Sequence, residues 1–176
     1  MDVRLLNSTD AEIYRNIRLQ SLREHPEAFL SSYEAEKEMP IETTRSRLNL
    51  SEERFTLGGF TENGELVGVV TFIRESRSKI QHKGNVVGMY VDQKVRGQRV
   101  GQALMKELIT RAAELPGLEI LNLSVVSSNI PAKRLYESLG FTLYGTERNA
   151  MKLEDSYLDE DFMSLALNLY NEETVR

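Results

Sequence analysis

A run of cations and glycines lies near the middle of the chain, directly after a predicted strand at Asn85–Val91. A polar loop follows this strand, and a long helix opens at Arg96-Gly97-Gln98-Arg99-Val100-Gly101. The first N–H groups of a helix lack partners within it, and the helix dipole favours negative charge there. Glycine lets a phosphate approach the backbone closely. The pattern therefore predicts an anion-binding loop; the alternative is an ordinary strand-to-helix turn with solvated arginines.

A second group of polar residues lies one predicted strand further along the chain. Asn129 precedes Pro131, which suits the first position of a helix, and Gly140 suits the end of that helix. Tyr136 projects from this helix, and its phenol is protonated at neutral pH because its ordinary pKa is about 10. Asn129 could bind a ligand or cap the helix. Tyr136 could donate a proton or pack in the core.

Hydrophobic periodicity and turn signals predict the elements that position these residues. The predicted strands are 3–6, 54–61, 65–74, 85–91, 118–126, 141–147 and 162–169, and the predicted helices are 9–24, 33–37, 41–50, 97–115 and 131–140. Ile13, Ile17 and Leu22 are expected on the buried side of the first helix. Asn63-Gly64 suits a tight hairpin turn. The order of elements predicts a mixed α/β sheet.

Composition narrows the classes of function. The chain has 176 residues, of which 40% are hydrophobic and 28% charged, and we expect a single globular domain over 1–176. The net charge of −5 argues against a general nucleic-acid binder, and the absence of cysteine excludes a thiolate nucleophile. With two distant histidines, no metal site is expected. Neither a membrane span nor a signal peptide is evident, so a cytoplasmic enzyme is expected.

Together the two groups resemble the GNAT superfamily of acetyl-CoA-dependent N-acetyltransferases. The pattern Arg/Gln-x-x-Gly-x-Gly/Ala falls on Arg96, Arg99 and Gly101, and a second pattern is met in full by Asn129, Ala132, Leu135, Tyr136, Gly140 and Phe141. The resemblance covers roughly 54–169. It implies a mixed, mostly antiparallel central sheet that is splayed at the cofactor site and flanked by helices. It also implies direct transfer of acetyl from acetyl-CoA to a primary amine of a small molecule or peptide, in a ternary complex.

The resemblance further implies roles for individual residues. Tyr136 would protonate the leaving thiolate, the backbone N–H of Met89 or Tyr90 would polarise the acetyl oxygen, and Phe29 and Tyr33 would bind the amine. The residues implied to bind the cofactor are Met89, Tyr90, Val91, Arg96, Gly97, Gln98, Arg99, Val100, Gly101, Gln102, Asn129, Ala132 and Tyr136. The general base stays unassigned, with Glu34, Glu36 and Glu38 as candidates in the segment that would cover the amine.

Three points stay open in the sequence. Arg99 replaces the glycine usual at the fourth position of the loop pattern; we expect it in the first helical turn, where it is unstrained and adds a phosphate partner. A non-catalytic acyl-CoA-binding regulatory module, or an interaction domain without a cofactor, is an alternative to an enzyme. The sequence also leaves open whether the chain forms a homodimer.

Overall fold

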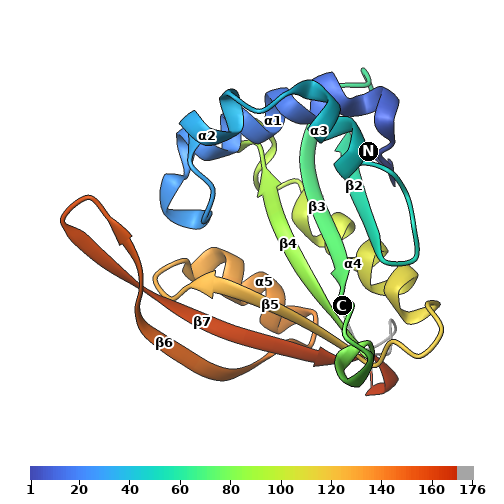
Figure 1. Ribbon diagram of the computed structural model, residues 1–176, viewed down its shortest axis with the longest axis vertical. Helices are drawn as coiled ribbons and strands as arrows, with labels where there is room; N and C mark the ends of the chain where they lie inside the picture. Colours follow the sequence, from blue (N-terminus) through green and yellow to red (C-terminus); the bar gives the residue numbers. More distant parts are fainter. Residues whose placement is uncertain (170–176) are drawn as a thin grey trace.

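A seven-stranded sheet forms the centre of the computed structural model, which describes residues 1–169 (Figure 1). Its spatial order is β1-β2-β3-β4-β5-β7-β6, and every neighbouring pair is antiparallel except β4 and β5. The mixed, mostly antiparallel sheet confirms the predicted fold class. The strands are β1 (Asp2–Leu5), β2 (Arg54–Phe60), β3 (Leu66–Arg74), β4 (Lys83–Val91), β5 (Ile120–Val126), β6 (Thr142–Leu153) and β7 (Ser156–Ala166).

Helices cover both faces of the sheet. Successive residues of a strand point to opposite sides, so each face carries its own apolar side chains for the helices to cover. Val70 belongs to the apolar cluster that α4 and α5 cover, whereas its neighbour Val69 belongs to the cluster under α1. No helix among residues 1–169 has both the length and the apolar character needed to cross a bilayer. The helices are α1 (Ala11–Glu24), α2 (Tyr33–Lys37), α3 (Ile41–Arg47), α4 (Val100–Ala113) and α5 (Ile130–Ser138).

The apolar stripe predicted for the long helix is confirmed in α4, whose Val100, Leu104, Leu108 and Ala112 are all buried. In α1, Ile17 and Leu22 are buried as predicted, but Ile13 is 40% exposed. A residue advances about 100° around a helix, so the inward face of α1 is centred between Ile17 and Leu22 and Ile13 lies beyond its edge.

The C-terminal hairpin differs most from the sequence prediction. Strands were predicted over 141–147 and 162–169, but β6 runs to Leu153 and β7 begins at Ser156. The last three residues of the predicted 162–169 strand, Leu167–Leu169, form a 3-10 turn instead. Much of the added hairpin is exposed on both faces, so its side chains lack the alternation that marks a half-buried strand. The hairpin reaches toward the segment before α2 (Figure 1).

Candidate active site

Strands β4 and β5 are paired over a short stretch only and then separate. Their parallel pairing is confined to Lys83–Asn85 against Ile120–Asn122. The remaining residues of the two strands diverge, and the opening between them is visible in Figure 1. The splaying of the sheet that the family resemblance implies is therefore found between β4 and β5. It gives an extended molecule a place to lie against strand backbone.

A β-bulge distorts β4 beside this opening. Tyr90 pairs with Val69 and Val87 pairs with Thr71, so Gly88 and Met89 lie opposite one residue of β3. Gly88 has φ +64°, a conformation that glycine adopts readily. A bulge removes backbone groups from the ladder and is frequent next to active sites. The bulge was not predicted from the sequence, although an isolated glycine inside a strand pattern is a signal for one.

The loop between β4 and α4 contains two left-handed residues, Gly97 with φ +80° and Arg99 with φ 60° and ψ 20°. The expectation that Arg99 lies unstrained in the first helical turn is wrong. The helix begins at Val100, and Arg99 is its N-cap residue. For a residue with a Cβ, the left-handed conformation costs about 1–2 kcal/mol. The side chains of Arg96 and Arg99 are exposed at this turn, as an anion-binding loop requires.

The strain at Arg99 gives a prediction that separates backbone from side chain. Arg99→Gly and Arg99→Ala both remove the guanidinium, but only alanine retains a Cβ. We expect the glycine variant to be more stable than the alanine variant by about 1 kcal/mol, because alanine is unfavourable at positive φ. Urea unfolding of the two variants measures this difference. A more stable alanine variant would mean that residue 99 is helical after all.

Gly101, which is predicted to bind the cofactor, also has a packing role. A Cβ there would lie 3.1 Å from Met89 Cε and 3.2 Å from Leu135 Cδ2. Glycine at this position therefore lets the first turn of α4 pack against β4 and α5. No heavy atom lies within 4 Å of a Cβ placed on Gly97, so the space beside that glycine is open.

Tyr136 lies on α5 and Asn129 is the N-cap residue of that helix, and the structure gives each a packing or capping contact. Asn129 Oδ1 accepts a hydrogen bond from the Ala132 N–H at 3.3 Å, which is the capping alternative. Tyr136 is 7% exposed and meets the Phe141 ring edge-on at 6.1 Å. Burial raises the pKa of Tyr136 to about 12, so the phenol is protonated at neutral pH as predicted.

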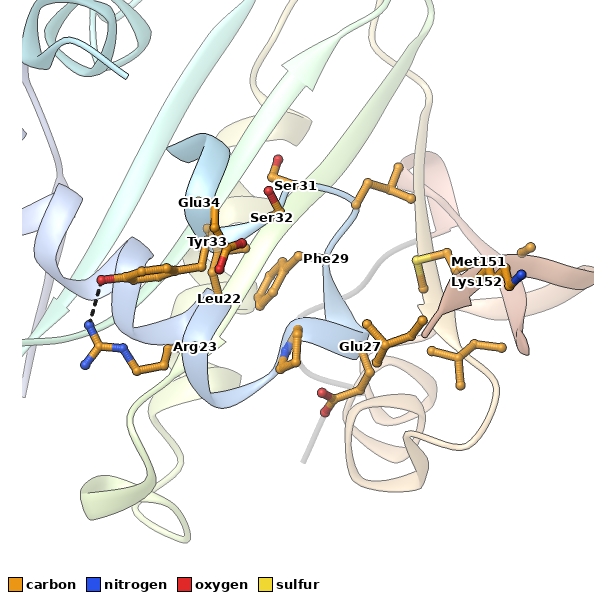
Figure 2. A pocket seen from close by; sticks show the side chains of 15 residues that line it. Leu22, Arg23, Glu27, Phe29, Ser31, Ser32, Tyr33, Glu34, Met151 and Lys152 are labelled. Atoms are coloured by element: carbon orange, nitrogen blue, oxygen red, sulfur yellow. Dashed lines mark hydrogen bonds between the residues drawn. The ribbon is translucent and has the colours of Figure 1, made fainter. Parts of the chain in front are cut away.

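A cavity of about 600 Å³ lies between the Pro26–Glu34 segment and the β6–β7 hairpin (Figure 2). Phe29 and Tyr33, the two residues expected to bind the amine, both line it. Tyr33 Oη accepts a hydrogen bond from Arg23 Nη2 at 3.0 Å. The hairpin contributes Met151 and Lys152 from the opposite wall. The extended hairpin that the sequence did not reveal thus completes this cavity.

Comparison with known proteins decides the family. Residues 19–141, more than half of the chain, match the acetyltransferase (GNAT) family. The chain belongs to this family. A Salmonella typhimurium acetyltransferase, solved with its cofactor acetyl-CoA, has a TM-score of 0.79 and 22% identity, covering 97% of this chain and 96% of that one. At this level of identity the likeness shows the GNAT fold alone.

Two relatives of the GNAT chain are N-acetyltransferases by name. It is 35% identical over 80 residues to N-alpha-acetyltransferase 30 of Dictyostelium discoideum, a match covering 46% of this chain and 42% of the relative. It is 28% identical over 102 residues to the L-amino acid N-acetyltransferase AaaT of Escherichia coli strain K12, covering 58% and 62% respectively. The chain thus matches about half the length of these relatives.

A chain of hydrogen bonds joins the loop of this GNAT protein to its cavity. Arg96 Nη2 lies 2.8 Å from His25 Nε2, and His25 Nδ1 lies 3.0 Å from Glu27 Oε1. Arginine can only donate, so Nε2 accepts from Arg96 and Nδ1–H donates to the Glu27 carboxylate. Glu27 lines the cavity. Residue types and spacing do not signal this link, because Arg96 lies far from His25 and Glu27 along the chain.

The carboxylates considered as a general base have unlike surroundings. Glu36 is 6% exposed and forms an ion pair with Arg47 at 2.8 Å, so it is occupied in holding α2 against α3. Glu34 lines the cavity and Glu38 is exposed outside its lining. Glu24, which was not considered, accepts a hydrogen bond from Tyr90 Oη at 2.6 Å. Burial and this hydrogen bond raise the pKa of Tyr90. The Tyr90 side chain is thereby fixed against α1.

A buried carboxylate that the sequence analysis missed anchors α5. Asp161 of β7 is 3% exposed and forms an ion pair with Lys133 of α5. It also accepts hydrogen bonds from Ser127 Oγ at 2.7 Å and Thr146 Oγ1 at 2.8 Å. The Lys133 contact, with these two hydroxyls, lowers the pKa of Asp161 to about 2. This cluster fixes the helix that carries Tyr136.

Proposed function

We propose that the chain is an acetyl-CoA-dependent N-acetyltransferase that acts on the amine of a small molecule or peptide. The observation that carries the proposal is the bulged β4, which parts from β5 beside an exposed glycine and arginine loop. The N-acetyltransferase names of two relatives and the acetyl-CoA bound to a structural neighbour support it. A single domain over 1–176 and a cytoplasmic location stay predictions from the sequence.

The described residues fit acetyl-CoA at both ends. The open space at Gly97 and the exposed Arg96 and Arg99 suit the pyrophosphate. The opening between β4 and β5 suits the pantetheine arm, with Met89, Tyr90 and Val91 offering strand backbone. Gln98, Val100 and Gln102 surround the first turn of α4, and Asn129 and Ala132 lie at the start of α5. Acetyl-CoA would supply the activated acetyl group.

The protein's own groups then divide the work of transfer. The backbone N–H of Met89 or Tyr90, at the bulge, would hold the acetyl oxygen as negative charge develops on it. Tyr136, protonated at neutral pH, would give its proton to the departing sulfur. The acceptor amine must lose a proton before or during attack, because an amine with an ordinary pKa near 10.4 is mostly protonated at pH 7. Glu27 and Glu34 are the carboxylates that line the cavity.

Binding and turnover can be measured separately. Acetyl-CoA at about 100 times its dissociation constant should stabilise the native state by about 2.7 kcal/mol, seen as a rise in Tm. A panel of amines with acetyl-CoA, assayed by thiol release, then tests transfer. A rise in Tm with no thiol release from any amine would favour the non-catalytic regulatory module. An unchanged Tm with acetyl-CoA, CoA and other acyl-CoAs would contradict both functions.

A further inference from the structure

Arg18 stands apart on the inward face of α1. It lies one residue after the buried Ile17 and one turn before the buried Leu22. Among residues 1–169, its Nη1 is the single fully buried side-chain nitrogen or oxygen that has no hydrogen-bond partner. No carboxylate in the described part of the chain forms an ion pair with it. A guanidinium is always charged, so the fold keeps an uncompensated positive charge here.

Other arginines around this face are satisfied within the protein. Arg4 is paired with Asp10 at 2.8 Å, and Arg47 with Glu36 at 2.8 Å. Arg15, on the same helix, donates to the Lys37 carbonyl oxygen at 2.6 Å. A buried donor without a partner lowers stability, so its retention calls for a use. Arg18 is the exception within its own neighbourhood.

The surroundings of Arg18 place it beside the acceptor cavity. Its Cζ lies 4.6 Å from the centre of the Phe29 ring, and Phe29 lines the cavity. Leu22, one helical turn further along α1, lines the same cavity. Stacking on Phe29 holds the plane of the guanidinium, and the N–H groups, including the unpartnered Nη1, lie in that plane. Arg18 is therefore one side chain from the place where the amine would bind.

The phosphates of acetyl-CoA are a poorer match for this charge. Gln20 and Glu24 form the stripe of α1 that faces the loop side of β4, through contacts with Asp92 and Tyr90. Positions two residues apart on a helix point about 200° apart, so Arg18 points away from that stripe. Leu22, which shares a stripe of α1 with Arg18, lines the cavity. The anion that Arg18 would meet thus belongs to the acceptor.

From this we infer that the acceptor amine carries a carboxylate, and that Arg18 binds this carboxylate. The planar fork of a guanidinium matches a carboxylate through two parallel hydrogen bonds. The apolar wall of the cavity, which includes Leu22, Phe29 and Met151, would receive the remainder of the molecule. The substrate class is then amino acids and related amino carboxylates. The inference rests on the proposed acetyltransferase function.

The test removes the contact between Arg18 and the carboxylate in two ways, by changing the substrate and by changing the arginine. Amino acids with the amine at the α, β or γ carbon are assayed beside their carboxamides, which keep the amine and lose the charge. The enzymes are wild type, Arg18→Met, Arg18→Lys and the control Arg15→Met. We expect wild type to prefer acids over amides in kcat/KM by about 10- to 100-fold, the range for a hydrogen bond to a charged group.

In Arg18→Met this preference should fall to near unity, because kcat/KM should fall for the acids and stay unchanged for the amides. The KM for acetyl-CoA should also stay unchanged. Arg18→Lys should retain an intermediate preference, because it keeps the charge without the fork, and Arg15→Met should behave as wild type. The Tm of Arg18→Met should be no lower than that of wild type, because an unpartnered buried donor is removed.

Several outcomes would overturn the inference. Equal use of acids and amides by wild type would overturn it while leaving the acetyltransferase function intact, as would a clear preference for long peptides that is insensitive to Arg18→Met. Equal loss of both substrate kinds in Arg18→Met, together with a lowered Tm, would make Arg18 a structural residue. Absence of acetyl transfer to every amine would instead remove the proposed function.

Discussion

Replacing Tyr136 by phenylalanine should lower kcat at least about tenfold and leave acetyl-CoA binding nearly unchanged. Proton delivery by a placed acid contributes typically 10²–10⁴-fold, about 3–5 kcal/mol of barrier, and water can substitute in part. The phenol is a suitable acid because burial raises its pKa to about 12, so it stays protonated across the usual assay range. Single-turnover thiol release, under conditions where chemistry limits the rate, measures the effect.

The phenylalanine variant should also be stable, so a loss of turnover would not be caused by unfolding. The Tyr136 hydroxyl forms no hydrogen bond within residues 1–169, and the ring contact with Phe141 survives the change. Tyr144→Phe is the matched control, because Tyr144 is 61% exposed on β6 and should not affect turnover. Wild-type turnover in Tyr136→Phe would make Tyr136 a packing residue, and the proton would then come from solvent.

The parts of the fold that the sequence predicted are those with local signals. The buried stripe of α4 repeats at helical spacing, at Val100, Leu104 and Leu108. The turn at Asn63-Gly64 joins the antiparallel strands β2 and β3. The second half of the β6–β7 hairpin has no such signal, because its side chains are exposed on both faces. Its pairing arises from the backbone, which leaves little trace in residue types.

The candidate site divides in the same way. The loop at Arg96 and the helix of Tyr136 were found from their motifs, but the conformation of Arg99 was not, because a motif does not fix φ. His25, Asp161 and the unpaired Arg18 acquire their significance from residues distant in sequence. Such contacts exist only after the chain has folded, so residue types and spacing do not reveal them.

Replacing Asp161 by asparagine should lower the free energy of unfolding by about 3 kcal/mol, the lower end of the range for breaking a buried ion pair. The lower end applies because the Lys133 side chain keeps 20% of its surface exposed, whereas that of Asp161 keeps 5%. Urea unfolding at pH 7 measures the change, which for a chain of this size corresponds to about 6–12 °C in Tm. Asp159→Asn is the control, since its partner Arg148 is 82% exposed, and it should change stability little.

The pH dependence of the Asp161 effect has a definite sign. The native pKa of Asp161, about 2, lies below the ordinary value near 3.9 of an unfolded aspartate. The carboxylate therefore contributes its full stability above about pH 4 and loses it as the pH falls toward 2. The gap between wild type and Asp161→Asn should close over that interval. Adding Lys133→Met to the asparagine variant should recover part of the lost stability, because the unpaired ammonium is removed. A gap that persists unchanged at pH 2, or a double variant less stable than the single one, would mean that packing around the side chain, and not the ion pair, anchors α5.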